Sequence, residues 1–452
     1  MDASQRRQEL LARLAKLDPP SAEECFVLLW SYLDLGRIVE AENFSHSGGV
    51  HHFRIEPHPL GKDHRKGLAA AVSRLEDTPA GRFELLCAQV LLAVDSVLSR
   101  RQPERVSQLG AIPDLDGQSC RVRRRNNFLS TTLGSRITTQ RDQSGTIDLY
   151  APAHISVPDT RSGIAIESLL ESSWGNRQLH RRLQAERNRL RVMLWPLTSV
   201  PDYPALKEEP RPELFVLETD ANEEALTGDV TEAIRCAREQ RVTLLIFPEL
   251  AMPPATQTAI RQILAAERDT GFPILTLFGC CHCRLAKGNC TNEAALVDWE
   301  GTEVAKRHRK IAKFSRRYAE SAFFGERIES GKSVLVFESA FGNLTPLICL
   351  DFFHEGLAEV VSSSHANVFA VPSLSPKTNA HLGRAKALQA HNLSSAFVCN
   401  RTLAGPSAAA PSFYHVPASK EDRRLRLHPA STEDGSSCLV FSLEEELDKS
   451  GS

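Results

Sequence analysis

The sequence predicts an α/β protein with an extra, mostly helical domain towards its N-terminal end. From Leu190 onward, apolar runs with β propensity alternate with helical patterns, which is typical of sheets covered by helices. Residues 1 to about 110 instead place apolar side chains at helical spacing, which is typical of helices that pack on one another. We therefore predict a helical domain at residues 1–185 and an α/β domain at residues 190–447.

The composition of the 452-residue chain is ordinary, with 42% hydrophobic residues, 24% charged residues and a formal net charge of −2. This balance favours neither a polyanionic partner nor a membrane surface. No apolar run approaches the roughly 20 residues of a membrane span. The first residues are charged and lack the apolar core of a signal peptide, and the 11 cysteines follow no small-scaffold pattern. We therefore expect reduced thiols and a cytoplasmic location.

Three helices are expected in the first domain, at about residues 10–17, 23–35 and 83–98, because each stretch carries an apolar stripe. Between the second and the third lie three histidines, within residues 46–52. Such a group suggests a metal site, but no cysteine or carboxylate cluster completes one. A polar loop is therefore favoured.

The next part of the chain favours β structure. Two short β-like runs, residues 137–139 and 146–150, flank an Asp-Gln-Ser-Gly turn and predict a hairpin. Four arginines lie between residues 121 and 125 and suggest a nucleic-acid contact. A solvated strand edge is favoured instead, because basic charge is neither extended nor dense elsewhere. Residues 163–192 then predict a long helix rich in Arg and Gln.

The α/β domain is expected to begin with a strand and to continue with strands and helices in turn. Its strands are short apolar runs bounded by turn residues, and its helices carry an apolar face. The expected strands are at residues 191–195, 242–247, 272–279 and 367–371, and the expected helices are at residues 223–239, 255–268 and 355–364.

Three reactive side chains follow apolar, strand-like stretches of this domain. Glu249 comes directly after the run 242–247, Lys310 ends a basic segment that follows a short strand, and Cys349 ends a buried run. Most cysteines in such runs are small core residues. The carboxyl ends of strands are, however, the usual place for sites in α/β proteins, and three such ends with complementary chemistry predict one site.

These strand ends resemble the signature segments of the nitrilase, or carbon–nitrogen hydrolase, superfamily. The resemblance rests on Phe247–Leu250, Arg309–Ile311 and Ile348–Asp351, in that order, and it covers roughly residues 190–447. It implies a nitrilase-like four-layer α-β-β-α sandwich. It also implies a cysteine-dependent hydrolase of a non-peptide carbon–nitrogen bond in an amide, carbamoyl group or nitrile, with no cofactor and no metal. Further family-like stretches are residues 292–297, 384–392, 397–401 and 437–443.

The resemblance implies a role for each reactive residue. Cys349 would attack the substrate and form a thioester, while Glu249 would take the thiol proton and pass it to the leaving amine. Lys310 would stabilise the oxyanion, with the backbone N–H of Leu350 as a second donor, and water activated by Glu249 would hydrolyse the thioester. The residue types suffice for this chemistry, because a thiol with an ordinary pKa of about 8.5 needs a base at neutral pH.

A second carboxylate often lies beside these residues in the family. Glu326 is the candidate here, and it would orient Lys310 or the substrate. Glu320 is its rival, and a surface-loop glutamate is an equally good interpretation of Glu326. Lys306 and Lys313 flank Lys310 and are its rivals, although the Arg-Lys-Ile match favours Lys310.

Four cysteines and a histidine gather within residues 280–290 and suggest zinc. Their spacing lacks the two separated ligand pairs of a zinc ribbon or finger, so core cysteines are favoured. His282 in this segment is a candidate to line the substrate pocket, with a solvated loop histidine as the alternative. Pro372 and Ser373 resemble the strand end after the family's cysteine helix, and we expect both to contact substrate.

Departures from the family pattern leave the substrate open. The residues after Cys349 match no subgroup closely, and residues 414–436 form a polar insertion. The alternative function is a nitrilase-fold binding or regulatory scaffold with weak or lost catalysis, which works with a protein partner through residues 1–185. An intact Glu249, Lys310 and Cys349 favours the enzyme, because a scaffold does not need all three. We expect a small-molecule amide-like substrate and a homo-oligomer, with neither a membrane nor a nucleic-acid partner.

Overall fold

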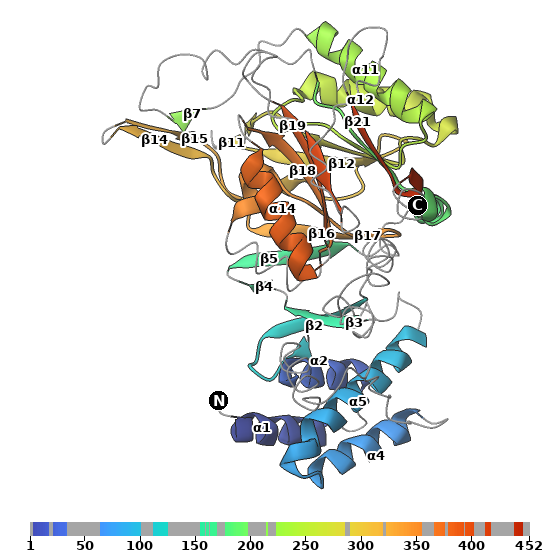
Figure 1. Ribbon diagram of the computed structural model, residues 1–452, viewed down its shortest axis with the longest axis vertical. Coiled ribbons are helices and arrows are strands. Elements are labelled where there is room, and N and C mark those ends of the chain that lie inside the picture. The colour runs from blue at the N-terminus through green and yellow to red at the C-terminus, as the bar shows by residue number, and fades with distance from the viewer. Residues whose placement is uncertain are drawn as a thin grey trace. The chain divides into compact units, whose positions relative to one another are not determined.

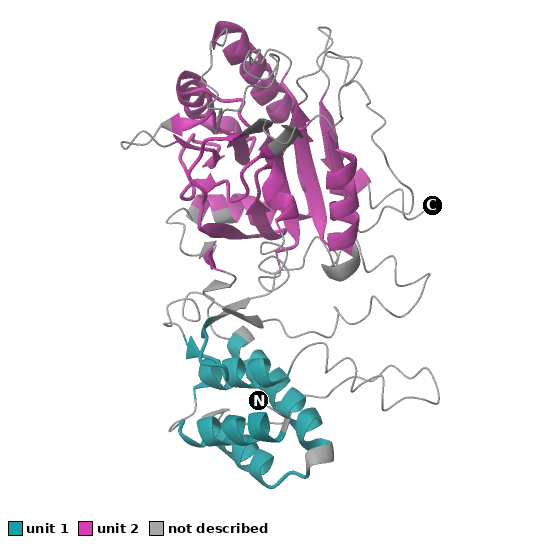
Figure 2. Ribbon diagram, turned by 90° about the vertical axis from the view of Figure 1, so that its left-hand side faces the viewer, with its two compact units in different colours: residues 1–126, 141–160 teal, residues 127–140, 161–452 magenta. Residues whose placement is uncertain are grey.

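The computed structural model divides the chain into two compact units, coloured separately in Figure 2. The first unit comprises residues 1–126 and 141–160, and the second comprises residues 127–140 and 161–452. None of the helices described is long and apolar enough to cross a membrane. The structure describes residues 3–17, 21–33, 64–100, 112–124, 154–158, 160–161, 163–169, 177–197, 214–215, 223–284, 290–319, 322–354, 366–375, 378–392, 394–401, 412–416 and 438–445.

The first unit packs helices around an apolar core and adds a small antiparallel sheet (Figure 1). Its mostly helical character is as predicted, and α4 is a helix that the sequence analysis did not include. Leu68, Val72 and Leu75 form the buried stripe of α4. The elements are α1 (Ala3–Ala15), α2 (Ala22–Tyr32), α4 (His64–Glu76), α5 (Ala80–Arg100), β1 (Ile112–Pro113), β2 (Ser119–Arg124) and β3 (His154–Pro158).

The arginine-rich stretch lies in β2, which pairs antiparallel with β3 over residues 120–124. On its other side β2 pairs with β1 only at Ser119 and Cys120. Among the described residues, β2 therefore has no second partner along Arg121–Arg124, and the solvation expected for this edge stays a prediction. The predicted hairpin at 137–150, the loop at 46–52 and the helix at 355–364 lie outside the described residues.

Two sheets form the centre of the second unit. Among the described residues, the first sheet has the order β13-β12-β9-β8-β6-β21 and the second has the order β20-β19-β18-β17-β16-β5-β4. The strands of the first sheet are β6 (Arg191–Leu194), β8 (Leu244–Ile246), β9 (Leu275–Gly279), β12 (Glu293–Asp298), β13 (His308–Arg309) and β21 (Leu439–Ser442). Those of the second sheet are β4 (Thr160–Arg161), β5 (Ile164–Leu169), β16 (Ser333–Ser339), β17 (Gly342–Pro346), β18 (Val368–Leu374), β19 (Ser395–Arg401) and β20 (Phe413–His415).

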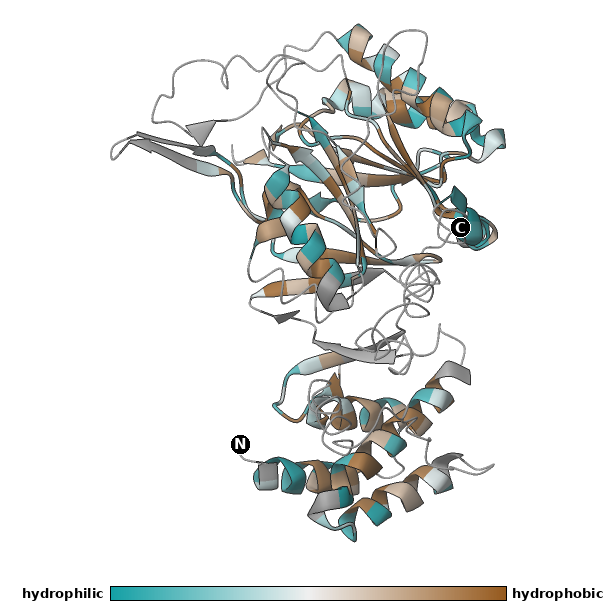
Figure 3. Ribbon diagram, viewed as in Figure 1, coloured by the Kyte–Doolittle hydropathy of each residue, from teal (hydrophilic) through white to brown (hydrophobic). Residues whose placement is uncertain are grey.

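Alternation along the strands explains how the layers are held together. Leu244 and Ile246 of β8 belong to a core shared with the second sheet, whereas Leu245 between them packs in a separate core with helix residues. Both faces of the first sheet are thus apolar, and its strands are largely brown, that is hydrophobic, in Figure 3. The helices are α9 (Arg177–Ala185), α11 (Glu223–Glu239), α12 (Pro254–Ala266) and α14 (Asn379–Asn392), with short 3₁₀ turns η3 (Arg187–Arg189), η4 (Arg268–Thr270) and η5 (Cys349–Phe353).

The layers are those of the predicted α-β-β-α sandwich. Helices α11 and α12 pack on the outer face of the first sheet through residues such as Val230 and Ile260. Helix α14 contacts β19 and β20 of the second sheet (Figure 1). Smaller strand groups lie beside the sandwich: β10 (Cys283–Arg284) with β11 (Cys290–Thr291), and β14 (Ser315–Ala319) with β15 (Ala322–Glu326) and β7 (Leu214–Phe215).

The long helix predicted over residues 163–192 is wrong. Ile164–Leu169 is the strand β5, which pairs in parallel with β16 from Ser333 to Phe337, and of the described residues in this stretch only Arg177–Ala185 form an α-helix. Ile164 and Ile166 are buried on alternate positions, and a period of two carried by only two residues is a weak strand signal. Residues 161–185 therefore belong to the second compact unit, whereas the sequence predicted a domain boundary near residue 185.

Candidate active site

Glu249 is placed by β8 and by the close approach of its neighbour β9. The apolar residues of β8 lead into Phe247 and Pro248, so the carboxylate lies directly beyond the strand end. Gly279 ends β9, and a Cβ atom there would lie only 2.6 Å from the Glu249 Cα. Glycine is required at this position, because any side chain would push the segment that carries Glu249 away.

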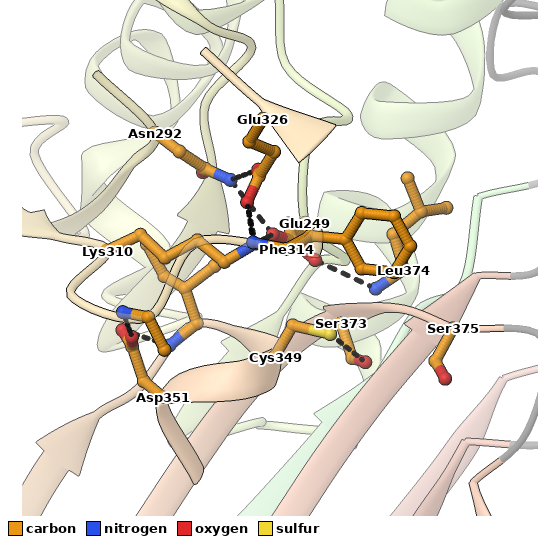
Figure 4. Close-up of polar contacts among 12 residues, drawn as sticks. Glu249, Asn292, Lys310, Phe314, Glu326, Cys349, Asp351, Ser373, Leu374 and Ser375 are labelled. Carbon is orange, nitrogen blue, oxygen red and sulfur yellow. Dashed lines mark hydrogen bonds and ion pairs between the residues drawn. The ribbon is translucent and has the colours of Figure 1, made fainter. Parts of the chain in front are cut away.

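Lys310 lies between two carboxylates in the interior of the second unit. Its Nζ is 2.7 Å from Glu249 Oε1 and 2.7 Å from Glu326 Oε2, and its side chain is only 2% exposed. Asn292 Nδ2 donates to the same pair of carboxylates, at 2.9 Å to Glu249 and 3.0 Å to Glu326. His282 Nε2 lies 3.3 Å from Glu326 Oε1. A buried charge is tolerated only when it is paired and hydrogen-bonded, and this cluster meets both conditions (Figure 4).

The charges of this cluster shift the pKa values of its members. Burial would lower the pKa of the Lys310 ammonium, but Glu249 and Glu326 outweigh burial and raise it. Burial raises the pKa of Glu249. For Glu326 the effect of burial is outweighed by Lys310 and by the hydrogen bond from His282, which lower its pKa to about 2. At neutral pH Lys310 is therefore charged and Glu326 is ionised, while Glu249 is the carboxylate that accepts a proton more readily.

Cys349 opens the turn η5 with its backbone in the left-handed region, at a φ of 45°. For a non-glycine residue this conformation costs on the order of 1–3 kcal/mol and persists only where its surroundings hold it. Asp351 provides that support. Its carboxylate accepts from the backbone N–H groups of Ile311 at 2.8 Å and Ala312 at 2.7 Å, and it lies 2.9 Å from His308 Nε2. One buried carboxylate thus ties the segment after β13 to the cysteine turn.

The thiol of Cys349 is almost fully buried and contacts the end of β18. Ser373 Oγ donates to Cys349 Sγ at 3.4 Å, and Ser373 Oγ is also 3.4 Å from His381 Nε2 on α14. The next backbone N–H, that of Leu374, donates to Glu249 Oε2 at 3.1 Å (Figure 4). The consecutive residues Ser373 and Leu374 therefore contact the Cys349 thiol and the Glu249 carboxylate, respectively.

Burial and the nearby Glu249 raise the pKa of the Cys349 thiol to about 12. Lys310 and the Ser373 hydroxyl act in the opposite direction, because each favours the thiolate. The thiol is therefore the resting form of Cys349 at neutral pH.

Most of the predicted site residues lie together in the structure. Leu350 follows Cys349 in η5. Pro372 is buried in β18 opposite Cys399. Because successive strand residues face opposite sides of a sheet, Pro372 points away from the side that bears Ser373, so its expected substrate contact does not fit this geometry. The predicted residues that the structure brings together are Glu249, His282, Lys310, Glu326, Cys349 and Ser373.

The rivals of Lys310 and Glu326 lie elsewhere or are not described. Lys306 is exposed and its Nζ lies 3.1 Å from Glu167 Oε1 of β5. Lys313 is exposed, and Glu320 lies outside the described residues. Among the candidates that are described, only Lys310 and Glu326 contact the cluster around Glu249.

Sequence reasoning gave no role to Asn292, Asp351 or His381. Asp351 lies within an otherwise apolar run and Asn292 shortly before one, and a polar side chain buried at such a place must find partners. That signal marks both residues as structural or functional, but it does not name their partners. His381 lies on a helix distant in sequence and carries no such signal. Within the described residues, no three His, Cys, Asp or Glu side chains are arranged to hold a metal ion, the cysteine-rich segment included.

Comparison with known families identifies the part of the chain that carries this cluster. Residues 211–409 match the model of the carbon–nitrogen hydrolase family. This stretch of the chain belongs to the carbon–nitrogen hydrolase family. The matched stretch contains Glu249, Lys310 and Cys349, and the family is the one that the strand-end segments resemble. No curated protein matches the chain.

Solved structures similar to the chain include amidases. An amidase from Nesterenkonia sp. has 17% sequence identity and a TM-score of 0.39, over 58% of this chain and 96% of that one. A variant of the amidase from Nesterenkonia sp. AN1, with the acetamide moiety of fluoroacetamide added covalently at its active-site cysteine, has 17% identity and a TM-score of 0.40. That match covers 57% of this chain and 92% of the other.

Proposed function

We propose that the second unit hydrolyses a non-peptide carbon–nitrogen bond, in an amide, carbamoyl group or nitrile, through a thioester on Cys349. The observation that carries the proposal is Lys310, a buried ammonium held between Glu249 and Glu326 at 2.7 Å from each and beside a buried thiol. A nucleophile, a base and a fixed cation in one water-poor site are what acyl transfer needs.

The first step is attack by the thiol with simultaneous loss of its proton. With a pKa of about 12, five units above pH 7, forming the free thiolate costs about 7 kcal/mol. Glu249 removes most of this cost by accepting the proton as the carbon–sulfur bond forms, and its raised pKa makes it a better base. The proton then passes from Glu249 to the leaving nitrogen, and the carbon–nitrogen bond breaks.

The negative charge that develops on the substrate oxygen needs donors in place before the reaction. Lys310 supplies a positive charge that Glu326 keeps in position, and the backbone N–H of Leu350 is the natural second donor in the turn after Cys349. Glu326 stays ionised because its pKa is lowered to about 2, so it holds Lys310 without competing for the proton that Glu249 handles. Water activated by Glu249 then cleaves the thioester and restores the thiol.

Intact mass spectrometry tests the proposal directly. The protein is mixed with a panel of small amides, carbamoyl compounds and nitriles, and samples are quenched in acid over time. We expect a mass increase equal to the acyl group, mapped to Cys349 and absent in Cys349→Ala. Cys399→Ala is the matched control, because it removes another buried cysteine, from β19, the strand that pairs with β18. Product release by Cys349→Ala at the wild-type rate would refute the proposal.

A further inference from the structure

The cysteine-rich segment after β9 forms a β-bulge. Gly279 lies opposite Ala294, and Cys283 lies opposite Thr291. Three residues, 280–282, therefore face two residues, 292–293, on the paired strands. An extra residue of this kind changes the direction in which the following side chains point.

The bulge places Cys280 and Cys283 on one side and His282 on the other. Cys280 belongs to the core beneath α11 and α12, Cys283 packs against that same core, and the Cys283 thiol donates to the backbone carbonyl of Cys281 at 3.3 Å. His282 instead reaches Glu326 in the cluster around Lys310. A Cys-X-X-Cys pair is thus joined through His282 to the candidate active site.

The surroundings of the pair give its two thiols different properties. Cys283 is partly exposed, and the hydrogen bond from Cys280 lowers its pKa. Cys280 is fully buried, and this hydrogen bond together with burial raises its pKa. The guanidinium Nη1 of Arg307 lies 3.6 Å from Cys280 Sγ and adds positive charge to the pair. A more exposed, more acidic thiol beside a buried resolving thiol is the arrangement found in redox-sensitive cysteines.

We propose that Cys280 and Cys283 are a redox modification site that forms a reversible disulfide. The oxidant is a low-molecular-weight disulfide. The Cys283 thiolate attacks one of its sulfur atoms, forms a mixed disulfide and expels one small thiolate. Cys280 then loses its proton and attacks the Cys283 sulfur, which expels the second small thiolate. The protein loses two protons and two electrons, and the oxidant becomes two thiols.

The geometry makes this disulfide accessible and links it to the cluster. Because both cysteines pack on the same core from one side of the bulge, the sulfur atoms can close to the roughly 2 Å of a disulfide without crossing a sheet. His282 lies between the two cysteines in sequence, so a change in the bulge is passed to its contact with Glu326. We therefore expect the disulfide to loosen the support of Lys310 and to slow reactions of Cys349.

Mass mapping after exposure to oxidised glutathione tests the disulfide independently of any hydrolase activity. In a Cys349→Ala background we expect the loss of two hydrogen atoms, mapped to Cys280 and Cys283 with Cys281 still alkylated. Cys280→Ala is expected to stop the reaction at a glutathione adduct on Cys283, and Cys283→Ser to prevent both products. Cys281→Ser is the matched control and should leave the disulfide unchanged.

The contrary results are as specific as the expected ones. A glutathione adduct that maps to a cysteine other than Cys283 in the Cys280→Ala variant would overturn the proposed redox site. A disulfide that still forms in the Cys283→Ser variant would overturn it too. The link to the cluster is tested in the chain that retains Cys349, by its alkylation rate before and after oxidation. We expect a fall of at least about tenfold that dithiothreitol reverses, and an unchanged rate in the oxidised protein would refute the link.

Discussion

The Ser373 hydroxyl provides a sharp test of how the thiolate of Cys349 is stabilised. It donates to Cys349 Sγ at 3.4 Å, a normal length for a bond to sulfur, and it also contacts His381. With the His381 proton on Nε2, that nitrogen donates to Ser373 Oγ and leaves the hydroxyl proton for the sulfur. Ser373→Ala removes this donor and leaves the charged cluster around Lys310 intact.

The expected magnitude follows from the strength of one charge-assisted hydrogen bond. Such a bond contributes about 1.5–3 kcal/mol, which corresponds to a rise of about one to two units in the pKa of Cys349. The pKa is already raised to about 12, so between pH 7 and pH 10 the thiolate fraction increases tenfold per pH unit. Ser373→Ala should therefore slow alkylation about ten- to hundredfold at every pH in that range.

The assay is the rate of Cys349 alkylation by iodoacetamide as a function of pH, followed by mass spectrometry of the Cys349 peptide. Ser375→Ala is the matched control, because the backbone N–H and C=O of Ser375 both bond to the Asn400 side chain and are kept in the variant. A Ser373→Ala profile within twofold of wild type, in a protein with an unchanged unfolding temperature, would refute the reasoning.

Other perturbations test the supports of the cluster. Glu326→Gln should lower turnover about 100-fold with little effect on KM, because Lys310 loses one of two charged partners, and a normal turnover would exclude the positioning role. Asp351→Asn should lower the free energy of unfolding by about 3 kcal/mol and slow the alkylation of Cys349. Asp298→Asn is the control, because Asp298 also accepts two backbone N–H bonds but at another turn. It should lower stability without slowing alkylation. Burial lowers the pKa of His381 from 6.5 to about 4, so the unfolded chain binds a proton that the folded chain does not, and stability should fall by about 3 kcal/mol between pH 6.5 and pH 4. His381→Gln should flatten that fall in thermal unfolding curves, and an equally steep curve would contradict the assignment.

The fold was predictable where a strand or helix carries its own pattern. Buried runs such as residues 242–247 and 272–279 are apolar on both faces because the sheet is covered on both sides, and that signal is local. Strand β5 was missed for the opposite reason. Its partner β16 lies more than 160 residues away in sequence, and its two buried isoleucines lie among polar residues. This strand forms because it pairs with a segment that is distant in sequence, and local β propensity does not report such tertiary pairing.

The candidate site shows the same division. Glu249, Lys310 and Cys349 became candidates because a reactive side chain at the end of an apolar strand can be recognised in the sequence alone. The bonds that position them were not visible, since Asp351 bonds to residues 40 and 39 positions earlier and His381 reaches the thiol through a serine. Sequence motifs therefore pointed to the candidate reactive residues, and the structure was needed for the residues that hold them.

Charge balance explains why the proton must move within the cluster. Two carboxylates and one ammonium already leave the buried site with one net negative charge, and a thiolate would add a second. The pKa values of Cys349 and Glu249 are raised in part because each of these groups, when ionised, faces another anion nearby. Transfer of the thiol proton to Glu249 keeps the net charge constant, so the attacking sulfur becomes nucleophilic without the cost of a second buried anion. In the proposed reaction, Lys310 would stabilise the group that carries the negative charge at each step: Glu249 at rest, sulfur during attack, and the substrate oxygen in the intermediate.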